Sequence, residues 1–200
     1  MNSTANFQRV NLEQGQQSRW TLREIAGRLV ELSSFWARAS LSLAFSLVFE
    51  AQRQGEPVGW ATSVESFFYP PDAAQAGIDL GALVVVRVPE ASDIPRAGEK
   101  LLRSGGFGLI VLDLGIADIP MPLQSRLTGL AHRHQTALIC LTEKNSKTFS
   151  LGSLVSLRAH AEKRRIAQNR FACALHVLKD KRHGPTWTHE EIHCGPPGLC

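Results

Sequence analysis

The chain of 200 residues has no apolar run long enough to cross a membrane. Its longest run, ALVVV at residues 82–86, is far shorter than the roughly 20 residues that a spanning helix needs. The first residues, MNSTANFQRVNLEQGQQ, contain no apolar core of the kind found in secretory signals. Internal repeats and low-complexity segments are also missing from the sequence. These absences lead us to expect a cytoplasmic protein.

Cysteine is scarce, with four residues in the whole chain. Cys140 and Cys173 stand in apolar stretches and are expected to be buried, whereas Cys194 and Cys200 stand close to the C-terminus. This distribution agrees with a reducing compartment and does not indicate a disulfide framework.

Hydrophobic residues make up 44% of the sequence and charged residues 20%, a composition that can bury a core. A chain of this length suits one domain. We predict a polar N-terminal arm over residues 1–24, a core over residues 25–195 and a tail over residues 196–200. Trp20 and Leu22 are the apolar residues expected to anchor the end of the arm.

Residues 27–55 have the strand, loop and helix layout of a phosphate-binding loop, but the phosphate-binding chemistry is missing. Such a loop follows G-x-x-x-x-G-K-[ST], in which backbone N–H groups cradle phosphates and a lysine neutralises them. Here Ser34 and Ala39 stand at the two glycine positions, and Ser40 stands at the lysine position. The added Cβ atoms hinder a close approach of the backbone. We interpret the segment as a nucleotide fold without a nucleotide site, and we expect no cofactor.

Apolar runs of strand length alternate with segments of helical spacing along the chain. The predicted strands are residues 29–32, 58–62, 83–88, 107–112 and 137–141, and the predicted helices are residues 40–54, 94–105 and 122–134, with a further helix start at Pro70-Pro71-Asp72. This alternation predicts an α/β fold in which right-handed crossovers build a mainly parallel sheet. The run LVVVRV at 83–88 is of the kind that is buried on both faces of a parallel sheet.

The secondary structure of residues 151–179 is left open by the residue pattern. The segment has no proline and one glycine, which allows a long basic helix. Apolar alternation at Phe171, Cys173, Leu175 and Val177 allows a strand instead.

Several segments resemble, in order and spacing, the core of the RecA recombinases and, more closely, the ImuA proteins of bacterial damage-induced mutagenesis. The segments that carry the resemblance are GRLVEL at 27–32, AQRQG at 51–55, RSGGFGLIVLDLG at 103–115, QTALICLTE at 135–143, SLRAHAEKRR at 156–165 and VLKDKRHGP at 177–185. The resemblance covers roughly residues 27–195. It implies a single-domain RecA-like P-loop core, in which a mainly parallel central sheet is extended by antiparallel edge strands.

The resemblance also implies former roles for single residues. Glu65 matches the glutamate that activates water in RecA, Asp113 matches the aspartate that helps to hold Mg²⁺, and Glu143 replaces the nucleotide-sensing glutamine. Lys179 and Lys181 match lysines that reach the nucleotide of a neighbouring protomer. We interpret the following as vestigial nucleotide-site positions without catalytic function, because the lysine that binds phosphate is missing: Ser40, Ser42, Glu65, Asp113 and Glu143.

The chain departs from the RecA pattern in three further places. RecA has a long N-terminal segment that packs onto the next protomer, whereas 26 residues precede Gly27 here. The stretches LGIADIPM after Asp113 and KNSKTFSLG after Glu143 are short where RecA has its two DNA-binding loops. We therefore do not expect active filaments or tight binding of single-stranded DNA.

The sequence HEEIH at 189–193 matches the H-E-x-x-H pattern of zinc proteases, which requires both histidines on one helix. Pro185 lies just before this segment, Gly195-Pro196-Pro197 follows it, and the resemblance places it on a strand. We interpret the match as coincidental and expect no metal site.

Phe35 and Trp36 stand where the phosphates of a nucleotide would lie. Aromatic residues in a strand-to-helix loop usually join the core, so we expect these two to plug the emptied pocket. The alternative is that they are exposed anchors for a partner.

Basic residues are concentrated between residues 158 and 182. The candidates for contact with DNA phosphates or an acidic protein surface are Arg158, Arg164, Arg165, Lys179, Lys181 and Arg182. The alternative is a solvated edge-strand face whose lysines discourage aggregation. Any DNA binding by this segment is expected to be weak and salt-sensitive.

These features predict a binding protein and not an enzyme. By its resemblance to ImuA proteins, the chain is expected to act in the SOS response to DNA damage, where it would bind RecA and an ImuB-type polymerase-like protein in translesion synthesis. Two alternatives stay open. One is a weak RecA-family ATPase in DNA repair, and the other is a SulA-type cell-division inhibitor.

Overall fold

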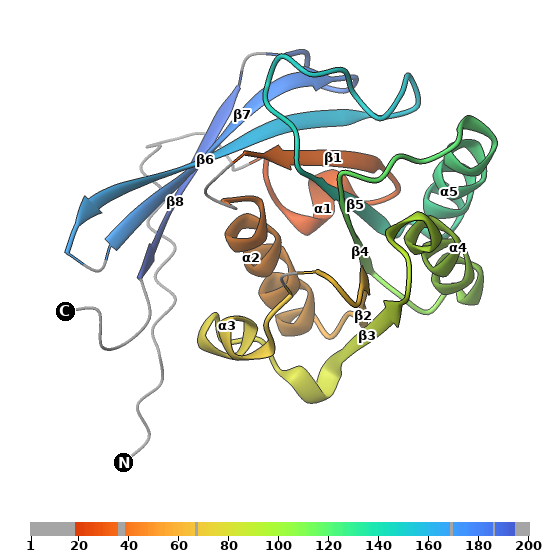
Figure 1. The fold of residues 1–200 in the computed structure, drawn as a ribbon, viewed down its shortest axis with the longest axis horizontal. Helices are drawn as coiled ribbons and strands as arrows, with labels where there is room; N and C mark the ends of the chain where they lie inside the picture. The colour runs from red at the N-terminus through yellow and green to blue at the C-terminus, as the bar shows by residue number, and fades with distance from the viewer. Residues whose placement is uncertain (1–18, 36–38, 67, 169, 186, 195–200) are drawn as a thin grey trace.

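The computed structural model describes residues 19–35, 39–66, 68–168, 170–185 and 187–194. Within them, the chain forms one eight-stranded sheet with helices on both faces (Figure 1). The strands are β1 (Leu29–Ser34), β2 (Val58–Ser63), β3 (Leu83–Val88), β4 (Leu109–Gly115), β5 (Ala137–Thr142), β6 (Leu157–Ala167), β7 (Arg170–Asp180) and β8 (Thr188–Cys194). The helices are α1 (Leu22–Ile25), α2 (Ala39–Arg53), α3 (Pro70–Gln75), α4 (Ile94–Ser104) and α5 (Met121–His134), with 3₁₀ turns η1 (Leu80–Ala82) and η2 (Ala91–Asp93).

The order of strands across the sheet is β3-β2-β4-β5-β1-β6-β7-β8. Neighbouring strands from β3 to β6 are parallel, and β7 pairs antiparallel with both β6 and β8. This confirms the predicted α/β fold, with a mainly parallel sheet extended by antiparallel edge strands. The β1–β6 pair joins the parallel strands to the β6–β7–β8 unit, and we call it the seam.

The segment that the residue pattern left undecided is a hairpin of two long strands, β6 and β7. The alternating residues Cys173, Leu175 and Val177 are buried in the cluster that contains α2. The side chains of β7 therefore follow a strand period of two, as the resemblance to RecA implied.

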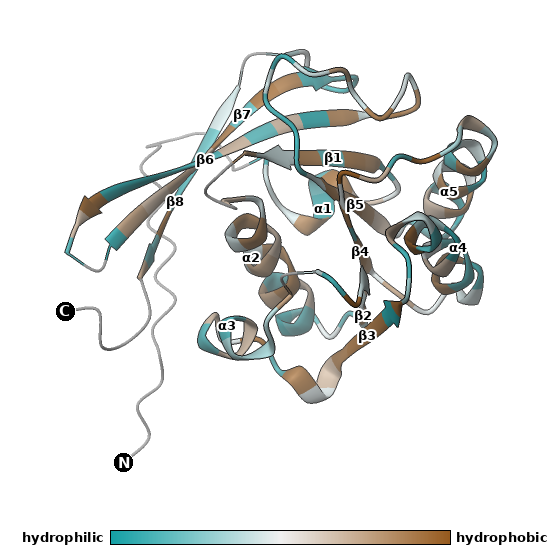
Figure 2. Ribbon diagram, viewed as in Figure 1, coloured by the Kyte–Doolittle hydropathy of each residue, from teal (hydrophilic) through white to brown (hydrophobic). Residues whose placement is uncertain are grey.

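The predicted burial of the LVVVRV strand is wrong. Within the described residues, β3 lies at one edge of the sheet and pairs only with β2. Val84 is 46% exposed and Val85 37%. Figure 2 shows β3 as a strongly hydrophobic ribbon at the margin of the molecule. Its composition is that of an interior strand, but the crossovers of the chain place it at the edge.

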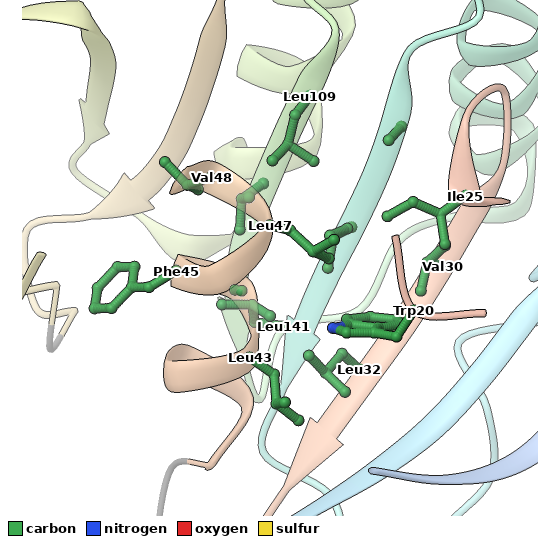
Figure 3. Packing of buried hydrophobic residues seen from close by; sticks show 14 of the residues in the cluster. Trp20, Ile25, Val30, Leu32, Leu43, Phe45, Leu47, Val48, Leu109 and Leu141 are labelled. Carbon is green, nitrogen blue, oxygen red and sulfur yellow. The ribbon is translucent and has the colours of Figure 1, made fainter. Parts of the chain in front are cut away.

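The core lies on both faces of the sheet. On one face, α1 and α2 cover β1 through residues such as Trp20, Val30 and Leu47 (Figure 3). On the other face, α4 and α5 cover Leu29 and its neighbours in a second cluster.

Trp20 and Leu22 are both buried, so the end of the predicted arm is anchored in the core as expected. Cys140 and Cys173 are buried too, whereas Cys194 is exposed. Residues 1–18 of the predicted arm and the predicted tail at 196–200 lie outside the described residues. Across the described part of the chain, no helix combines the length and apolar character needed to span a membrane.

Candidate functional site

The carboxyl ends of β1, β4 and β5 lie side by side, because these strands are neighbours and parallel. Open α/β sheets bind their ligands beyond this edge. At this edge, the strand ends and the first turn of α2 enclose a small cavity. Its lining consists of Ser34, Ser40, Leu41, Asp113, Gly115, Leu141, Thr142 and Glu143.

Short hydroxyl side chains close this cavity. Ser34 Oγ and Ser40 Oγ share a hydrogen bond of 2.7 Å, and both residues are buried. The space that remains is about 10 Å³, roughly the room of one water molecule. The hydroxyl of Ser40, hydrogen-bonded to Ser34 at the end of β1, thus stands where a phosphate-binding loop has its lysine. At the described positions, the chain therefore supplies neither the lysine nor the glycine backbone with which a phosphate-binding loop holds a nucleoside triphosphate.

Asp113 lies at the cavity, as the sequence predicted, but its carboxylate already has hydroxyl partners. Asp113 Oδ2 accepts hydrogen bonds from Thr62 Oγ1 at 3.1 Å and from Ser66 Oγ at 2.5 Å. Ser66 Oγ in turn accepts the N–H of Phe68 at 3.0 Å. In this arrangement, Asp113 fixes the turn that follows β2.

The other vestigial positions are divided between the cavity and its surroundings. Glu143 lines the cavity, and its backbone N–H donates to Gly115 O at 2.8 Å. Glu65 is exposed and is not part of the lining. Burial raises the pKa of the Cys173 thiol on β7, and the nearby Ser42 side chain opposes this rise. The structure therefore gathers Ser40, Asp113 and Glu143 around one cavity and leaves Ser42 and Glu65 outside it.

The expectation that Phe35 plugs the pocket is wrong, because its side chain is 52% exposed. The Ser34–Ser40 hydrogen bond and Leu41 occupy the space instead. Among the described residues, the lining of the cavity contains hydroxyl side chains and no aromatic ring. Trp36 lies outside the described residues.

Three of the predicted basic residues hold the loop between β5 and β6. Arg158 donates to Thr148 O, while Lys179 Nζ and Lys181 Nζ donate to Ser153 O at 3.3 and 2.8 Å. Burial, and then the charge of Lys181, lower the pKa of Lys179. These cations therefore have a structural role in the chain itself.

The remaining basic residues lie elsewhere, so the six do not form one face. Arg182 donates to the backbone carbonyl of Glu24 at 3.0 Å. Arg164 lies 3.7 Å from Glu190, and Arg165 Nε donates to Ala167 O near the far end of the hairpin. Six residues of extended strand, roughly 20 Å, separate Arg164 from the basic residues at the start of β6.

Glu31, in the middle of β1, is a buried charge that sequence reasoning missed. Its side chain has no exposed surface, and its Oε2 accepts Ser150 Oγ at 2.6 Å and Leu151 N–H at 3.0 Å. Lys144 Nζ and Arg158 Nε lie 3.6 and 3.7 Å from its carboxylate. A buried carboxylate needs such partners. The signal in the sequence was a single charge inside the apolar strand GRLVEL.

The HEEIH segment forms β8, as the resemblance implied. His189, Glu191 and His193 alternate on one face of the strand, and the Glu191 carboxylate lies 2.9 and 3.3 Å from the two imidazoles. Ser46 Oγ of α2 donates to Glu191 at 2.5 Å. Since the two histidines are not one helical turn apart, the zinc-protease geometry does not form. Among the described residues, no three His, Cys, Asp or Glu side chains are placed to hold a metal ion.

A larger cavity of about 370 Å³ lies on the other side of the molecule, near the amino ends of the parallel strands. Its walls come from the ends of α1, α2 and α5 and from the turn before β4. The residues are Leu22, Arg23, Ala26, Gln54, Glu56, Gly105, Gly106, Phe107, Gly108, His134 and Gln135. Sequence reasoning did not find this cavity, because its residues come from four separate turns that carry no common motif.

Comparisons with known proteins agree with this architecture. No protein-family model matches the chain. The chain is similar to Protein RecA of Nocardioides sp., with 30% identity over 134 residues, which are 61% of this chain and 37% of that RecA. It is also similar to Protein RecA of Fusobacterium nucleatum (26% over 141 residues, 60% and 37%) and of Chlorobium chlorochromatii (28% over 125 residues, 56% and 35%). The chain spans a little over a third of the length of these relatives. The sheet topology and these partial matches together support a RecA-like family for this chain.

Proposed function

We propose that this chain is a non-catalytic RecA-like adaptor in SOS-induced mutagenesis and translesion synthesis, which binds RecA and an ImuB-type polymerase-like protein. The observation that carries the proposal is the cavity at the carboxyl edge, closed by the Ser34–Ser40 hydrogen bond to about 10 Å³. The surrounding strands and crossovers remain those of a RecA-like core. The chain thus keeps the RecA-like scaffold but lacks the groups that bind a triphosphate. Such a scaffold is suited to binding other macromolecules.

The uncovered edge of the sheet supports a binding role. β3 pairs with β2 on one side, and its other side offers main-chain N–H and C=O groups together with Val84 and Val85. Such an edge is a template for the addition of a strand from another chain. We propose this edge as one surface on which a partner protein docks.

Calorimetric titration with ATP and Mg²⁺ tests the absence of nucleotide chemistry. We expect no binding heat at millimolar ATP. A micromolar affinity would instead favour the weak ATPase. That enzyme would use Asp113 and Glu65 together with Lys179 and Lys181.

A binding assay with purified RecA and the ImuB-type protein tests the adaptor role. The wild-type chain should bind both proteins, and the Val84→Lys/Val85→Lys double variant should lose one of them. Ile166→Lys is the control, because Ile166 is a similarly exposed apolar strand residue on the β6–β7 hairpin. Binding to neither protein, together with inhibition of cell-division polymers, would favour the SulA-type alternative.

A further inference from the structure

The loop between β5 and β6, residues 143–156, combines tight anchoring with one very exposed aromatic side chain. Phe149 is 90% exposed, more than any other large hydrophobic residue that the structure describes. Single exposed apolar residues are common on protein surfaces and need no explanation by themselves. Phe149 is distinguished by its backbone, because hydrogen bonds hold the residues on both sides of it.

The residues on both sides of Phe149 are held by hydrogen bonds. On the N-terminal side, Asn145 Oδ1 accepts the N–H groups of Lys147 and Thr148 at 3.0 and 2.9 Å, and Arg158 donates to Thr148 O. This side of the loop is thus fixed from within and from β6.

On the C-terminal side, buried Glu31 accepts Ser150 Oγ and Leu151 N–H, and Gln124 of α5 donates to Leu151 O at 2.7 Å. The side chain of Leu151 is buried in the core cluster of α4 and α5. Figure 1 shows the loop passing over the sheet between the ends of β5 and β6. Phe149 is therefore presented in a fixed place, and a partner that binds it has little loop entropy left to restrict.

The surroundings of Phe149 are positively charged. The loop itself carries Lys144 and Lys147 and the acidic Glu143. Arg158, Lys179 and Lys181 donate to its backbone, and buried Glu31 lies beneath it. A surface of this kind attracts an acidic partner at long range. An exposed aromatic residue beside polar groups is also common in protein-binding surfaces.

We infer that Phe149 is the anchor of a second docking surface, which inserts into an apolar pocket on an acidic surface of a partner protein. This inference rests on the proposed adaptor function and identifies the element that carries it. A nucleic acid fits less well, because proteins that bind single strands usually stack successive bases on a series of aromatic rings. On the described part of this loop, Phe149 is a single exposed ring.

The test measures binding of purified RecA and of the ImuB-type protein to wild-type chain, Phe149→Ala and Ile116→Ala by biolayer interferometry. Ile116 is the matched control, because it is an 84% exposed apolar residue on the loop after β4. We expect Phe149→Ala to weaken the binding of one of the two proteins at least tenfold and to leave the melting temperature unchanged. Ile116→Ala should bind like the wild type, and raised salt should slow association.

The outcomes separate this inference from the proposed function. If the wild-type chain binds a partner and Phe149→Ala binds it equally well, the docking surface is elsewhere and the adaptor role stands. If the wild type binds neither protein, the adaptor role and this inference both fail. Fluorescence anisotropy with a labelled oligo(dT) is the third measurement. A loss of oligo(dT) binding in Phe149→Ala, with protein binding unchanged, would assign the residue to nucleic acid and overturn the inference.

Discussion

Arg28 and Asp180 are 152 positions apart in the chain, yet Arg28 Nη2 lies 2.5 Å from Asp180 Oδ1 in a buried ion pair. Arg28 directly precedes β1 and Asp180 ends β7, so the pair crosses the seam. Asp180 also accepts the N–H of Arg182 at 2.9 Å and the indole N–H of Trp187 at 3.1 Å. The buried carboxylate is thus fully supplied with donors.

This pair predicts a pH-dependent effect of Asp180→Asn. Burial raises the pKa of Asp180, but the Arg182 N–H, the Arg28 guanidinium and the Trp187 indole outweigh it and lower the pKa from 3.8 to about 2. The charged form therefore stabilises the fold above pH 3.8, and this contribution is lost as the pH falls towards 2. Asp180→Asn should lower the free energy of unfolding by about 3 kcal/mol at pH 7, because it leaves Arg28 buried without a counter-charge.

Urea unfolding at pH 7 and pH 3 measures this effect, and the difference from the wild type should shrink at pH 3. Asp93→Asn is the control, because Asp93 forms an exposed ion pair with Arg96 at 3.5 Å. Its effect should stay within about 0.5 kcal/mol. An equal loss for Asp180→Asn at both pH values would contradict the assignment.

The edge position of β3 predicts different tolerances for two valines of similar sequence context. Val111→Ala in the buried strand β4 should cost about 2 kcal/mol, since it opens a cavity in the core. Val84→Ala in β3 should change the free energy of unfolding by less than about 0.5 kcal/mol. Chemical denaturation of both variants measures the contrast, and a large loss for Val84→Ala would mean that β3 is covered.

Two helical glycines should respond oppositely to alanine. A Cβ at Gly98 of α4 would lie 2.6 Å from Leu112 Cδ2 on β4, whereas a Cβ at Gly129 of α5 would meet nothing within 4 Å. Gly98→Ala should therefore destabilise by about 1 kcal/mol through overpacking, despite the better helix propensity of alanine. Gly129→Ala should stabilise by about 0.5–1 kcal/mol. Thermal melts of the two variants give the sign of each effect.

A lysine at position 40 should destabilise the fold and should not restore nucleotide binding. Ser40→Lys places a charged side chain where about 10 Å³ is free and removes the Ser34 hydrogen bond. We expect a loss of about 3 kcal/mol from overpacking and burial of the charge. Ser40→Ala, the control, should cost about 1 kcal/mol. If ATP with Mg²⁺ raised the melting temperature of Ser40→Lys, the cavity would be more adaptable than its geometry indicates.

The buried thiols should resist alkylation. Burial, and then the charge of Glu31, raise the pKa of Cys140, and burial raises the pKa of Cys173. Because the thiolate is the reactive form, iodoacetamide at pH 8 should label exposed Cys194 and spare both buried thiols. Peptide mapping by mass spectrometry distinguishes the sites, and urea should make all of them reactive. Labelling of Cys140 in the native protein would show that the core opens.

The sequence predicted local structure best at positions where a single residue type determines the backbone conformation. The helix start at Pro70 follows from local stereochemistry, and the structure confirms it. The strand predicted over residues 107–112 exists, but β4 begins at Leu109 and continues past Asp113 to Gly115. The serines at 34 and 40 predicted the loss of phosphate-loop chemistry, but not the hydrogen bond that closes the cavity. That bond depends on how closely α2 approaches β1.

Long-range relationships could not be predicted from local patterns. The composition of β3 indicated burial, but its edge position depends on the order of crossovers across the whole sheet. Ser150, which bonds to Glu31, and Arg28, which pairs with Asp180, are each more than a hundred residues from their partner, so no local motif predicted these contacts. The basic residues near β6 looked like a free surface, because their acceptors are backbone carbonyls, which a sequence does not distinguish.

The seam affects the order in which the parts of the sheet would unfold. Glu31 and Arg158 face each other across β1 and β6, and Arg28 and Asp180 join the beginning of β1 to the end of β7. The two portions of the sheet are thus connected by opposite charges as well as by one ladder of hydrogen bonds. Strong acid protonates Asp180 and removes its charge pairing with Arg28, whereas the apolar contacts of α2 with β6 and β7 persist. Acidification should therefore weaken this boundary before it melts the parallel layers. The antiparallel strands would then exchange their amide protons as a separate unit.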